Sequence, residues 1–288
     1  MTIATLLVSC RDRTGLVAAL SQFVFENGGN IVDLDQHAET DSGMFFMRLA
    51  WDLASFKLDR DGLDAGLAYL AKRFELTLSL TLSDRRPRVA VFASKVPHCL
   101  YDLLMAEQLG DLGGEIAAVI SNHADLAPVA GHFGKAFHHV PVAAGADAEV
   151  SKAAAEQRQR ALLADAGVDL VVLARYMQIV SPRFCQDWQG RLINIHHSFL
   201  PAFAGAKPYH QAKERGVKLI GATAHYVTAE LDQGPIIDQG VARVSHRDEV
   251  EDLIRKGREL ERQVLTRAVR LHLQRRVLVS GNRTIVFE

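Results

Sequence analysis

The spacing of hydrophobic residues divides the chain into two regions with different patterns. In the first region, short apolar strands with alternating side chains are interleaved with helices whose apolar residues recur every three or four positions. Strands are predicted at 3–9, 31–37, 44–51 and 76–82, and helices at 15–27 and 63–74. This βαββαβ order predicts a ferredoxin-like domain.

From residue 88 onward, the apolar runs become continuous and are separated by longer helical patterns. Runs of this kind are typical of strands buried on both faces of a parallel sheet. Strands are predicted at 89–93, 116–120, 137–141 and 170–174, with helices at 97–109, 124–133 and 147–166 between them. The second region is therefore predicted to be a doubly wound α/β domain with a mostly parallel sheet.

The C-terminal part continues with two more strands, at 218–227 and 235–244, and a helix from about 248 to 276. That helix is dense in Arg and Glu, which indicates a solvated face with paired charges rather than a binding surface. Two short strands around a Gly-Asn turn are expected in 277–287. The predicted domains are 1–83 and 88–288, joined by a charged, proline-containing linker at 84–87.

Composition and charge narrow the class of function. The chain has 288 residues, 48% of them hydrophobic, which is enough to build two cores. Its 33 basic and 34 acidic residues nearly cancel, so neither a nucleic acid nor an anionic membrane is an expected partner, and a small-molecule substrate is. The N-terminus lacks the pattern of a signal peptide. Three widely separated cysteines favour a reducing cytoplasm and argue against a Cys-based metal or redox site (Cys10, Cys99, Cys185).

In a doubly wound sheet the ligand crevice lies outside the carboxyl ends of the strands. Polar residues follow four of the predicted strands at these positions, and we expect them to meet in space: Ser94-Lys95, Ser121-Asn122-His123, Ala174-Arg175-Tyr176-Met177 and Asn194-Ile195-His196.

The strongest chemical signal lies between Leu192 and Asp238. Asn194 and His196 are two residues apart in a predicted strand, so their amide and imidazole point the same way and can both contact one carbonyl group. Asn can donate a hydrogen bond to a developing oxyanion, and His can relay a proton. Asp232, in a Leu-Asp-Gln-Gly turn, can orient the imidazole or hold a water. This set predicts attack on a carbonyl.

Two other chemistries fit the same stretch less well. Ser198 lies near His196, but the Gly-x-Ser-x-Gly elbow that exposes a serine nucleophile is missing. The histidines of this stretch raise the possibility of a zinc site, yet neither His-x-x-x-His on a helix nor a cysteine pair is present, so no metal is expected. His197 is predicted to be a structural histidine on the face opposite His196.

A family resemblance enters in the first region. The segments Val8-Ser-Cys-Arg-Asp-Arg-Thr-Gly15 and Asn27-Gly-Gly-Asn30-Ile31 resemble those of ACT regulatory domains. The resemblance implies an amino-acid effector, with four candidate contacts (Asp12, Arg13, Gly15, Asn30). The alternative is structural: Asp12 and Thr14 cap the first helix, Gly15 eases the turn, and the domain serves for dimerisation.

A second resemblance covers the rest of the chain. Asn194-Ile-His196, Ser198-Phe-Leu-Pro201, His225-Tyr-Val and Asp232-Gln-Gly-Pro-Ile-Ile resemble the formyltransferases that use 10-formyltetrahydrofolate. It implies that Asn194, His196 and Asp232 form the catalytic set and that the substrate is a folate, bound by Tyr176, Met177, Ile179 and His225. With the ACT-like region in front, the domain order resembles that of the formyltetrahydrofolate deformylases, enzymes that need no metal or cofactor.

One departure from the transferase pattern concerns the acceptor. Glycinamide ribonucleotide formyltransferases carry a glycine-rich loop after the first strand, where backbone N–H groups cradle a phosphate. The same place here reads Ala93-Ser-Lys95-Val-Pro97-His98, in which Pro97 removes an N–H and no glycine allows the loop to curl. Water is therefore the expected acceptor, and the expected reaction is hydrolysis to tetrahydrofolate and formate, supplying formate for purine synthesis. A transferase with an unidentified acceptor and a non-catalytic regulator remain as alternatives, and a homo-oligomer is expected by resemblance.

Overall fold

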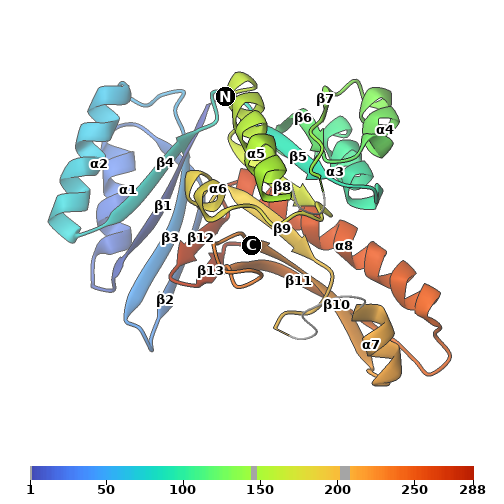
Figure 1. Ribbon diagram of the computed structural model, residues 1–288. Coiled ribbons are helices and arrows are strands. Elements are labelled where there is room, and N and C mark those ends of the chain that lie inside the picture. The colour runs from blue at the N-terminus through green and yellow to red at the C-terminus, as the bar shows by residue number, and fades with distance from the viewer. Residues whose placement is uncertain (1, 144–147, 202–207) are drawn as a thin grey trace. The chain divides into compact units, whose positions relative to one another are not determined.

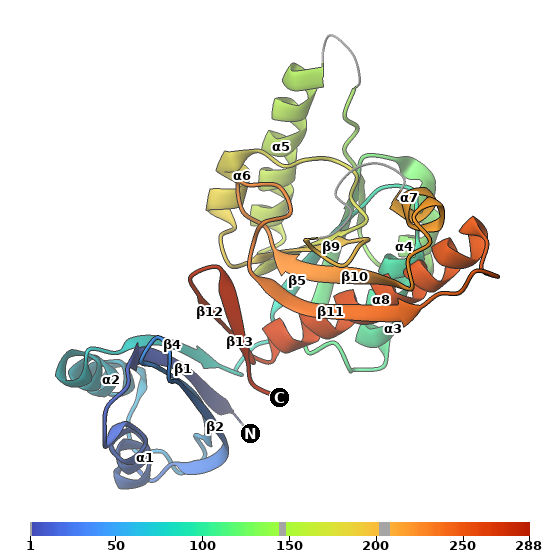
Figure 2. The same cartoon turned by 90° about the horizontal axis from the view of Figure 1, so that it is seen from below.

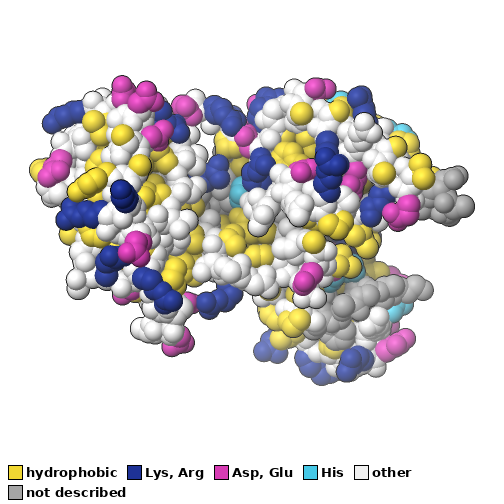
Figure 3. Space-filling model, turned by 60° about the vertical axis from the view of Figure 1, so that its left-hand side comes forward, with side chains coloured by type: hydrophobic (Ala, Val, Ile, Leu, Met, Phe, Trp, Pro, Cys, Tyr) yellow, Lys and Arg dark blue, Asp and Glu magenta, His cyan; other side chains and the backbone are white. Residues whose placement is uncertain are grey.

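We describe the chain from a computed structural model, which places residues 2–143, 148–201 and 208–288. The chain forms two compact units (Figure 1). The first contains the residues up to Arg86 together with Arg275–Leu278 and Ile285–Glu288, and the second contains Pro87–Gln274 and Val279–Thr284. None of the described helices is long and apolar enough to cross a membrane. On the face drawn in Figure 3, acidic and basic side chains are interspersed.

The first unit is the predicted βαββαβ domain. Its antiparallel sheet has the strand order β2-β3-β1-β4, built from β1 (Ile3–Arg11), β2 (Asn30–Glu39), β3 (Met44–Asp52) and β4 (Thr77–Leu82). The helices α1 (Leu16–Glu26) and α2 (Arg60–Phe74) cover one face of it, where every second residue of β1 is buried. The fold is confirmed, because alternation in the strands and three-to-four spacing in the helices produce the two halves of one apolar core.

The second face of this sheet is covered by residues from the C-terminal end of the chain, 275–288, which we call the tail. Phe46 on β3 packs with Leu278 and Phe287, and all three are almost fully buried. On the same face Arg48, 7% exposed, pairs with Asp33 and donates from Nε to the carbonyl of Arg275 at 3.0 Å. The sequence-based boundary gave all of 88–288 to the second domain. In the structure, Arg275–Leu278 and Ile285–Glu288 belong to the first unit instead, because Leu278 and Phe287 bury their side chains there.

The second unit is built on a seven-stranded sheet with the order β11-β10-β9-β8-β5-β6-β7. Five strands run parallel, and β10 pairs antiparallel with both β9 and β11. The bounds are β5 (Arg88–Ala93), β6 (Glu115–Ser121), β7 (Phe137–His139), β8 (Leu170–Ala174), β9 (Leu192–His196), β10 (Leu219–Tyr226) and β11 (Ile236–Arg243). β7 stops short of the predicted 137–141, since Pro141 cannot donate to a ladder.

Helices cover both faces of this sheet, as expected for a doubly wound domain (Figure 2). One side carries α5 (Ala148–Asp165) and α6 (Pro182–Asp187), whose Leu162, Leu163 and Phe184 pack on Phe92 and Val171. The other side carries α3 (His98–Gln108) and α8 (Val250–Leu273), which pack on each other; α8 also packs on β9–β11, and α3 packs on β6. The predicted helix 124–133 is a 3₁₀ turn (Ala124–Leu126) followed by α4 (Ala127–His132).

Two short helices were not predicted from the sequence. One is α6, where Ser181 caps the N-terminus by accepting a hydrogen bond from Phe184 N at 3.2 Å and Pro182 occupies the first turn. Serine followed by proline is a known start signal, but six residues are too few to show a periodic pattern. The other is α7 (Pro208–Glu214). The tail forms the expected pair of strands, β12 (Val277–Ser280) and β13 (Arg283–Val286).

Candidate active site

The predicted strand-end residues meet at the point where the strand order reverses, between β5 and β8. Ser94 donates from Oγ to Oδ1 of Asn122 at 2.7 Å, and the backbone N–H of Met177 donates to the same Ser94 oxygen at 3.0 Å. Ser94 and Asn122 are buried. These bonds join the loops after β5, β6 and β8, so the crevice expected from the topology exists.

A cavity of about 300 Å³ opens beside these loops. Four segments form it: the end of β8 with the loop after it, the end of β9, the end of β10, and the loop between β10 and β11. The residues that line it are Leu173, Arg175, Tyr176, Met177, Gln178, Ile179, Val180, Asn194, Ile195, His196, His197, His225, Val227, Thr228, Ala229, Leu231 and Asp232.

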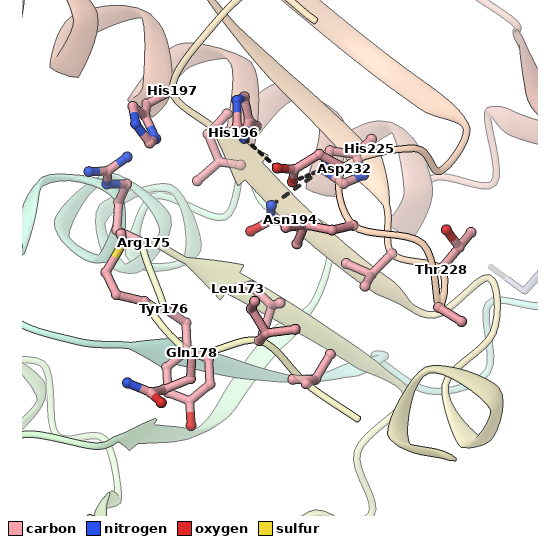
Figure 4. Close-up of a pocket in the computed structure, with 17 residues that line it drawn as sticks. Leu173, Arg175, Tyr176, Gln178, Asn194, His196, His197, His225, Thr228 and Asp232 are labelled. Carbon is pink, nitrogen blue, oxygen red and sulfur yellow. Dashed lines mark hydrogen bonds and ion pairs between the residues drawn. The ribbon is translucent and has the colours of Figure 1, made fainter. Parts of the chain in front are cut away.

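Asn194, His196 and Asp232 lie together in this cavity (Figure 4). The alternation of β9 places Asn194 and His196 on one face, as predicted. His196 Nδ1 lies 3.1 Å from Asp232 Oδ2, whereas Nε2 of the same ring is buried and has no hydrogen-bond partner among the described residues. Since Nδ1 faces a carboxylate, it carries the ring proton, and Nε2 remains available to a bound ligand.

The loop between β10 and β11 holds Asp232 through backbone contacts. Asp232 itself has a left-handed backbone, with φ 55°. Two residues later, Gly234 lies so close to β10 that a Cβ atom there would come within 1.8 Å of the carbonyl oxygen of Tyr226. Tyr226 N also donates to Pro235 O at 2.9 Å. The Asp-Gln-Gly-Pro sequence is therefore what brings the loop back against the strand and aims the carboxylate.

The environment of Asp232 keeps its carboxylate ionised. Hydrogen bonds with His196 and His225 hold the pKa of Asp232 well below its usual value, against the opposing effect of partial burial. An ionised carboxylate can also stabilise positive charge that develops on the neighbouring imidazole during a reaction. The pair can thus hold and move a proton at His196 Nε2.

His225 also lines the cavity, and from β10 it supports Asn194 and Asp232. Its side chain is almost completely buried, its Nδ1 lies 2.9 Å from Tyr226 O, and its Nε2 lies 3.3 Å from Asn194 Nδ2 and 3.5 Å from Asp232 Oδ1. A neutral ring accepts from Asn194 and a protonated ring donates to Asp232. In both states His225 positions the groups in front of it.

The predicted apolar wall is present, but its members differ in exposure. Met177 and Ile179 are 60% and 62% exposed, so they form an open apolar edge on which a flat ring can pack. Tyr176 is buried, and its hydroxyl accepts a hydrogen bond from Gln159 Nε2 at 2.9 Å while its ring packs edge-on against Phe92. Tyr176 therefore supports the wall from inside the core.

The prediction for His197 was wrong. Its ring stacks on that of His196, with centroids 5.2 Å apart and 25° between the planes, and it lines the same cavity. β9 ends at His196, so the strand alternation no longer applies one residue later. Burial, followed by the charge of Arg175, lowers the pKa of His197 to about 4, and the ring is therefore neutral near neutral pH. Ser198, considered as a nucleophile, does not line the cavity.

A buried acidic residue next to the cavity was missed from the sequence. Glu261 belongs to the helix that was predicted to be solvated, yet it is 1% exposed and contacts His98, Arg175 and Tyr209. Its position on the apolar stripe of α8, three residues before Val264 and four before Leu265, was the available signal. His98, Cys99 and Glu261 bring their ligand atoms within 4.8 Å of one another, but Arg175 already provides a cation there.

The candidate effector residues fall into two places in the first unit. Asp12, Arg13 and Gly15 border an open hollow of about 670 Å³ together with Ser21 and Gln36. Asn30 does not border this hollow. It is the first residue of β2 and pairs with Asp52 on β3, whereas Gln36, which borders the hollow, lies farther along β2. The expected capping is absent: the N-cap of α1 is Gly15, with φ 91°, and no side chain caps the helix.

Comparison with known proteins gives consistent matches. The description "Formyl transferase" fits residues 87–269 and "ACT domain" fits residues 4–50. The formyltetrahydrofolate deformylase of Synechocystis sp. is 53% identical over 99% of this chain and 98% of its own. The crystal structure of a formyltetrahydrofolate deformylase from Pseudomonas syringae pv. tomato superposes with a TM-score of 0.94 at 45% identity, covering 100% of this chain and 95% of that one. Glycinamide ribonucleotide transformylase 1 from Symbiobacterium toebii gives a TM-score of 0.66 at 35% identity, covering 73% of this chain and 98% of that one.

Proposed function

Since this chain belongs to the formyltetrahydrofolate deformylase family, we propose that it hydrolyses 10-formyltetrahydrofolate to tetrahydrofolate and formate. The similarity to the Synechocystis deformylase covers 99% of this chain and so includes both units, whereas the Symbiobacterium toebii transformylase covers 73% of this chain. Formate released in this way supplies purine synthesis and balances one-carbon pools. No metal or cofactor enters the proposed reaction.

The observation that carries the proposal is the pair of donors on β9 in front of Asp232. Asn194 and His196 project from the same strand face into the cavity. Asn194 Nδ2 can donate to the formyl oxygen as negative charge develops on it, and His196 can donate through Nε2 once that nitrogen also carries a proton. Such charge is stabilised only in the transition state, which is the condition for catalysis rather than tight binding alone.

The remaining steps concern water and one proton. Asp232, held ionised, accepts a hydrogen bond from a water molecule and directs its oxygen at the formyl carbon. As the C–O bond forms, the acidity of this water rises, and its proton passes to the Asp232–His196 pair. The pair then returns a proton to N10 of the folate when the C–N bond breaks, so that formate and tetrahydrofolate leave.

The folate itself fits the apolar edge of the cavity. Met177 and Ile179, in the loop after β8, offer exposed apolar surface to the flat pterin ring. We assign Tyr176 and His225 supporting roles behind this surface, on the basis of their burial and hydrogen bonds.

The test is to supply purified protein with 10-formyltetrahydrofolate, without any amine, and to measure both formate and tetrahydrofolate. Equal amounts of the two products are expected. Turnover that requires an added amine would instead indicate a transferase, and binding without turnover would indicate a regulator.

The first unit has a regulatory role in this proposal. The hollow bordered by Asp12, Arg13 and Gly15 is offered as the site of an amino-acid effector, supported by the ACT match and by the presence of an acidic and a basic residue in its lining. A homo-oligomer is part of the proposal, supported by the edge position of β2 and its exposed Val32 and Leu34. A cytoplasmic location is supported by the unbridged cysteines.

A further inference from the structure

A buried group of charged and polar side chains closes one end of the catalytic cavity. Glu261 on α8 lies at its centre, with Oε2 at 2.7 Å from His98 Nε2 and 3.5 Å from Arg175 Nε, and Oε1 at 3.1 Å from the hydroxyl of Tyr209. We call these four residues the Glu261 cluster. They come from α3, the loop after β8, α7 and α8, so four separate elements converge on one carboxylate.

The Glu261 carboxylate contacts the other three members, whereas His98 Nδ1 and Arg175 Nε are buried with no hydrogen-bond partner among the described residues. Burial of Glu261 would raise its pKa, but the hydrogen bond from His98 and the charge of Arg175 outweigh burial and lower it. The carboxylate therefore stays charged, and its cation is Arg175. The absence of a side chain at Gly257 on α8 makes room for Tyr209, because a Cβ atom at Gly257 would lie 1.9 Å from the Tyr209 hydroxyl.

The backbone of Arg175 is unusual for a residue with a side chain. It has φ 61°, in the left-handed region that glycine adopts freely and other residues rarely occupy. A glycine would fit this turn without strain. The arginine is therefore held there by the contacts of its side chain, and strain of this kind at a cavity wall points to a function.

Arg175 also occupies a defined end of the cavity. Together with His197 it lies at one end, while Thr228 lies at the other and Asn194 and His196 lie between them (Figure 4). The exposed apolar edge of Met177 provides the entrance for the folate. The cavity of about 300 Å³ is at the small end of the range for ligand sites, which runs from about 300 to 1,000 Å³.

We propose that Arg175, anchored by Glu261, blocks the place where an amine acceptor would bind and so restricts the nucleophile to water. This inference rests on the proposed function and deepens it, since it assigns the choice between hydrolysis and transfer to named residues. In hydrolysis the water oxygen bonds to the formyl carbon, the bond to N10 breaks, and N10 takes up a proton. In transfer an amine nitrogen would form the new bond and give up the proton that N10 receives.

The test uses full-length Arg175→Gly protein, because glycine preserves the left-handed backbone while removing the side chain. Wild type and variant are each supplied with 10-formyltetrahydrofolate carrying a ¹³C-labelled formyl group and with increasing concentrations of glycinamide. NMR measures the ratio of N-formylglycinamide to formate. This ratio should stay at the non-enzymatic background for wild type and rise with glycinamide for the variant, by on the order of tenfold or more.

Two further variants keep the test decisive. Arg275→Gly makes the same change at another left-handed arginine, φ 55°, in the other unit, and should give formate alone. Glu261→Gln retains hydrogen bonding but releases Arg175, and should give an intermediate ratio. The proposal is overturned if folded Arg175→Gly and Glu261→Gln proteins both form only formate, or if they lose all turnover. Wild type that releases no formate at all would overturn the proposed function instead.

Discussion

The backbone of Gly234 lies directly against the carbonyl oxygen of Tyr226, with only 1.8 Å available for a Cβ atom. This approach holds the loop that carries Asp232. Gly234→Ala must push the loop away from β10, and displacing a catalytic group by about 1 Å can cost on the order of a hundredfold in rate. We expect kcat for formate release to fall by about that factor. Gly131→Ala, at a position with open space, is the matched control and should leave the rate within twofold of wild type.

Asp232→Asn tests the charge opposite His196 while preserving shape. An amide can offer its NH₂ to His196 and so stabilise the wrong tautomer, as happens when the acid of a catalytic triad is changed in this way. We expect kcat to fall by roughly a thousandfold or more. Normal folding would be verified by circular dichroism and thermal unfolding. Asp238→Asn on β11, which alters the salt bridge with Arg267 on α8, serves as the control; near-normal turnover in Asp232→Asn would contradict the assignment.

Asn194→Ala removes one of the two donors for the formyl oxygen. Loss of such a donor costs about 2.7–4 kcal/mol of transition-state stabilisation, which corresponds to a decrease in kcat of roughly 10²–10³ with little change in KM. Steady-state kinetics with 10-formyltetrahydrofolate separate the two parameters. If KM rises and kcat does not change, Asn194 binds the ground state and the oxyanion role is wrong.

His197 makes a prediction about stability at acid pH. Its pKa is about 4 in the folded protein and about 6.5 in the unfolded chain, so between these values the unfolded chain binds more protons. The stability that neutral His197 contributes is complete above pH 6.5 and is lost as the pH falls toward 4. Urea unfolding of wild type and His197→Asn over this range should show a steeper decline in wild type. Parallel curves would contradict the lowered pKa.

Phe287→Ala tests the packing of the tail on the first unit. Phe287 is 2% exposed and packs with Phe46 and Leu278, and removing a buried phenyl ring costs about 3–5 kcal/mol. Denaturant unfolding should show this loss in the free energy of unfolding. Val279→Ala, at a residue 44% exposed, should change it by less than about 0.5 kcal/mol. Equal effects of the two changes would mean that the tail does not stabilise the unit.

The sequence was sufficient to predict the elements of the first unit and the long helices and strands of the second, because strand alternation and helical spacing each report one buried face, but it missed the short helices α6 and α7. It was also sufficient for Asn194 and His196, since their relative direction depends only on the period of a strand. The sequence was insufficient for His197, whose position depends on where β9 ends. It was also insufficient for Glu261, because the many charged residues of α8 indicate a solvated helix although Glu261 lies on its apolar stripe. The burial of Phe46 depends on residues more than two hundred positions away, and local patterns carry no information about such a contact.

The C-terminal tail has a consequence for synthesis of the chain. Domains emerging from a ribosome generally fold in order, the N-terminal one first. Here the sheet face that contains Phe46 stays uncovered until Leu278 and Phe287 have been made, although the rest of the first unit is complete by Arg86. The second unit must therefore be translated while the first still exposes apolar surface. Chains that stop before the tail would keep that surface exposed, a feature that chaperones and proteases recognise.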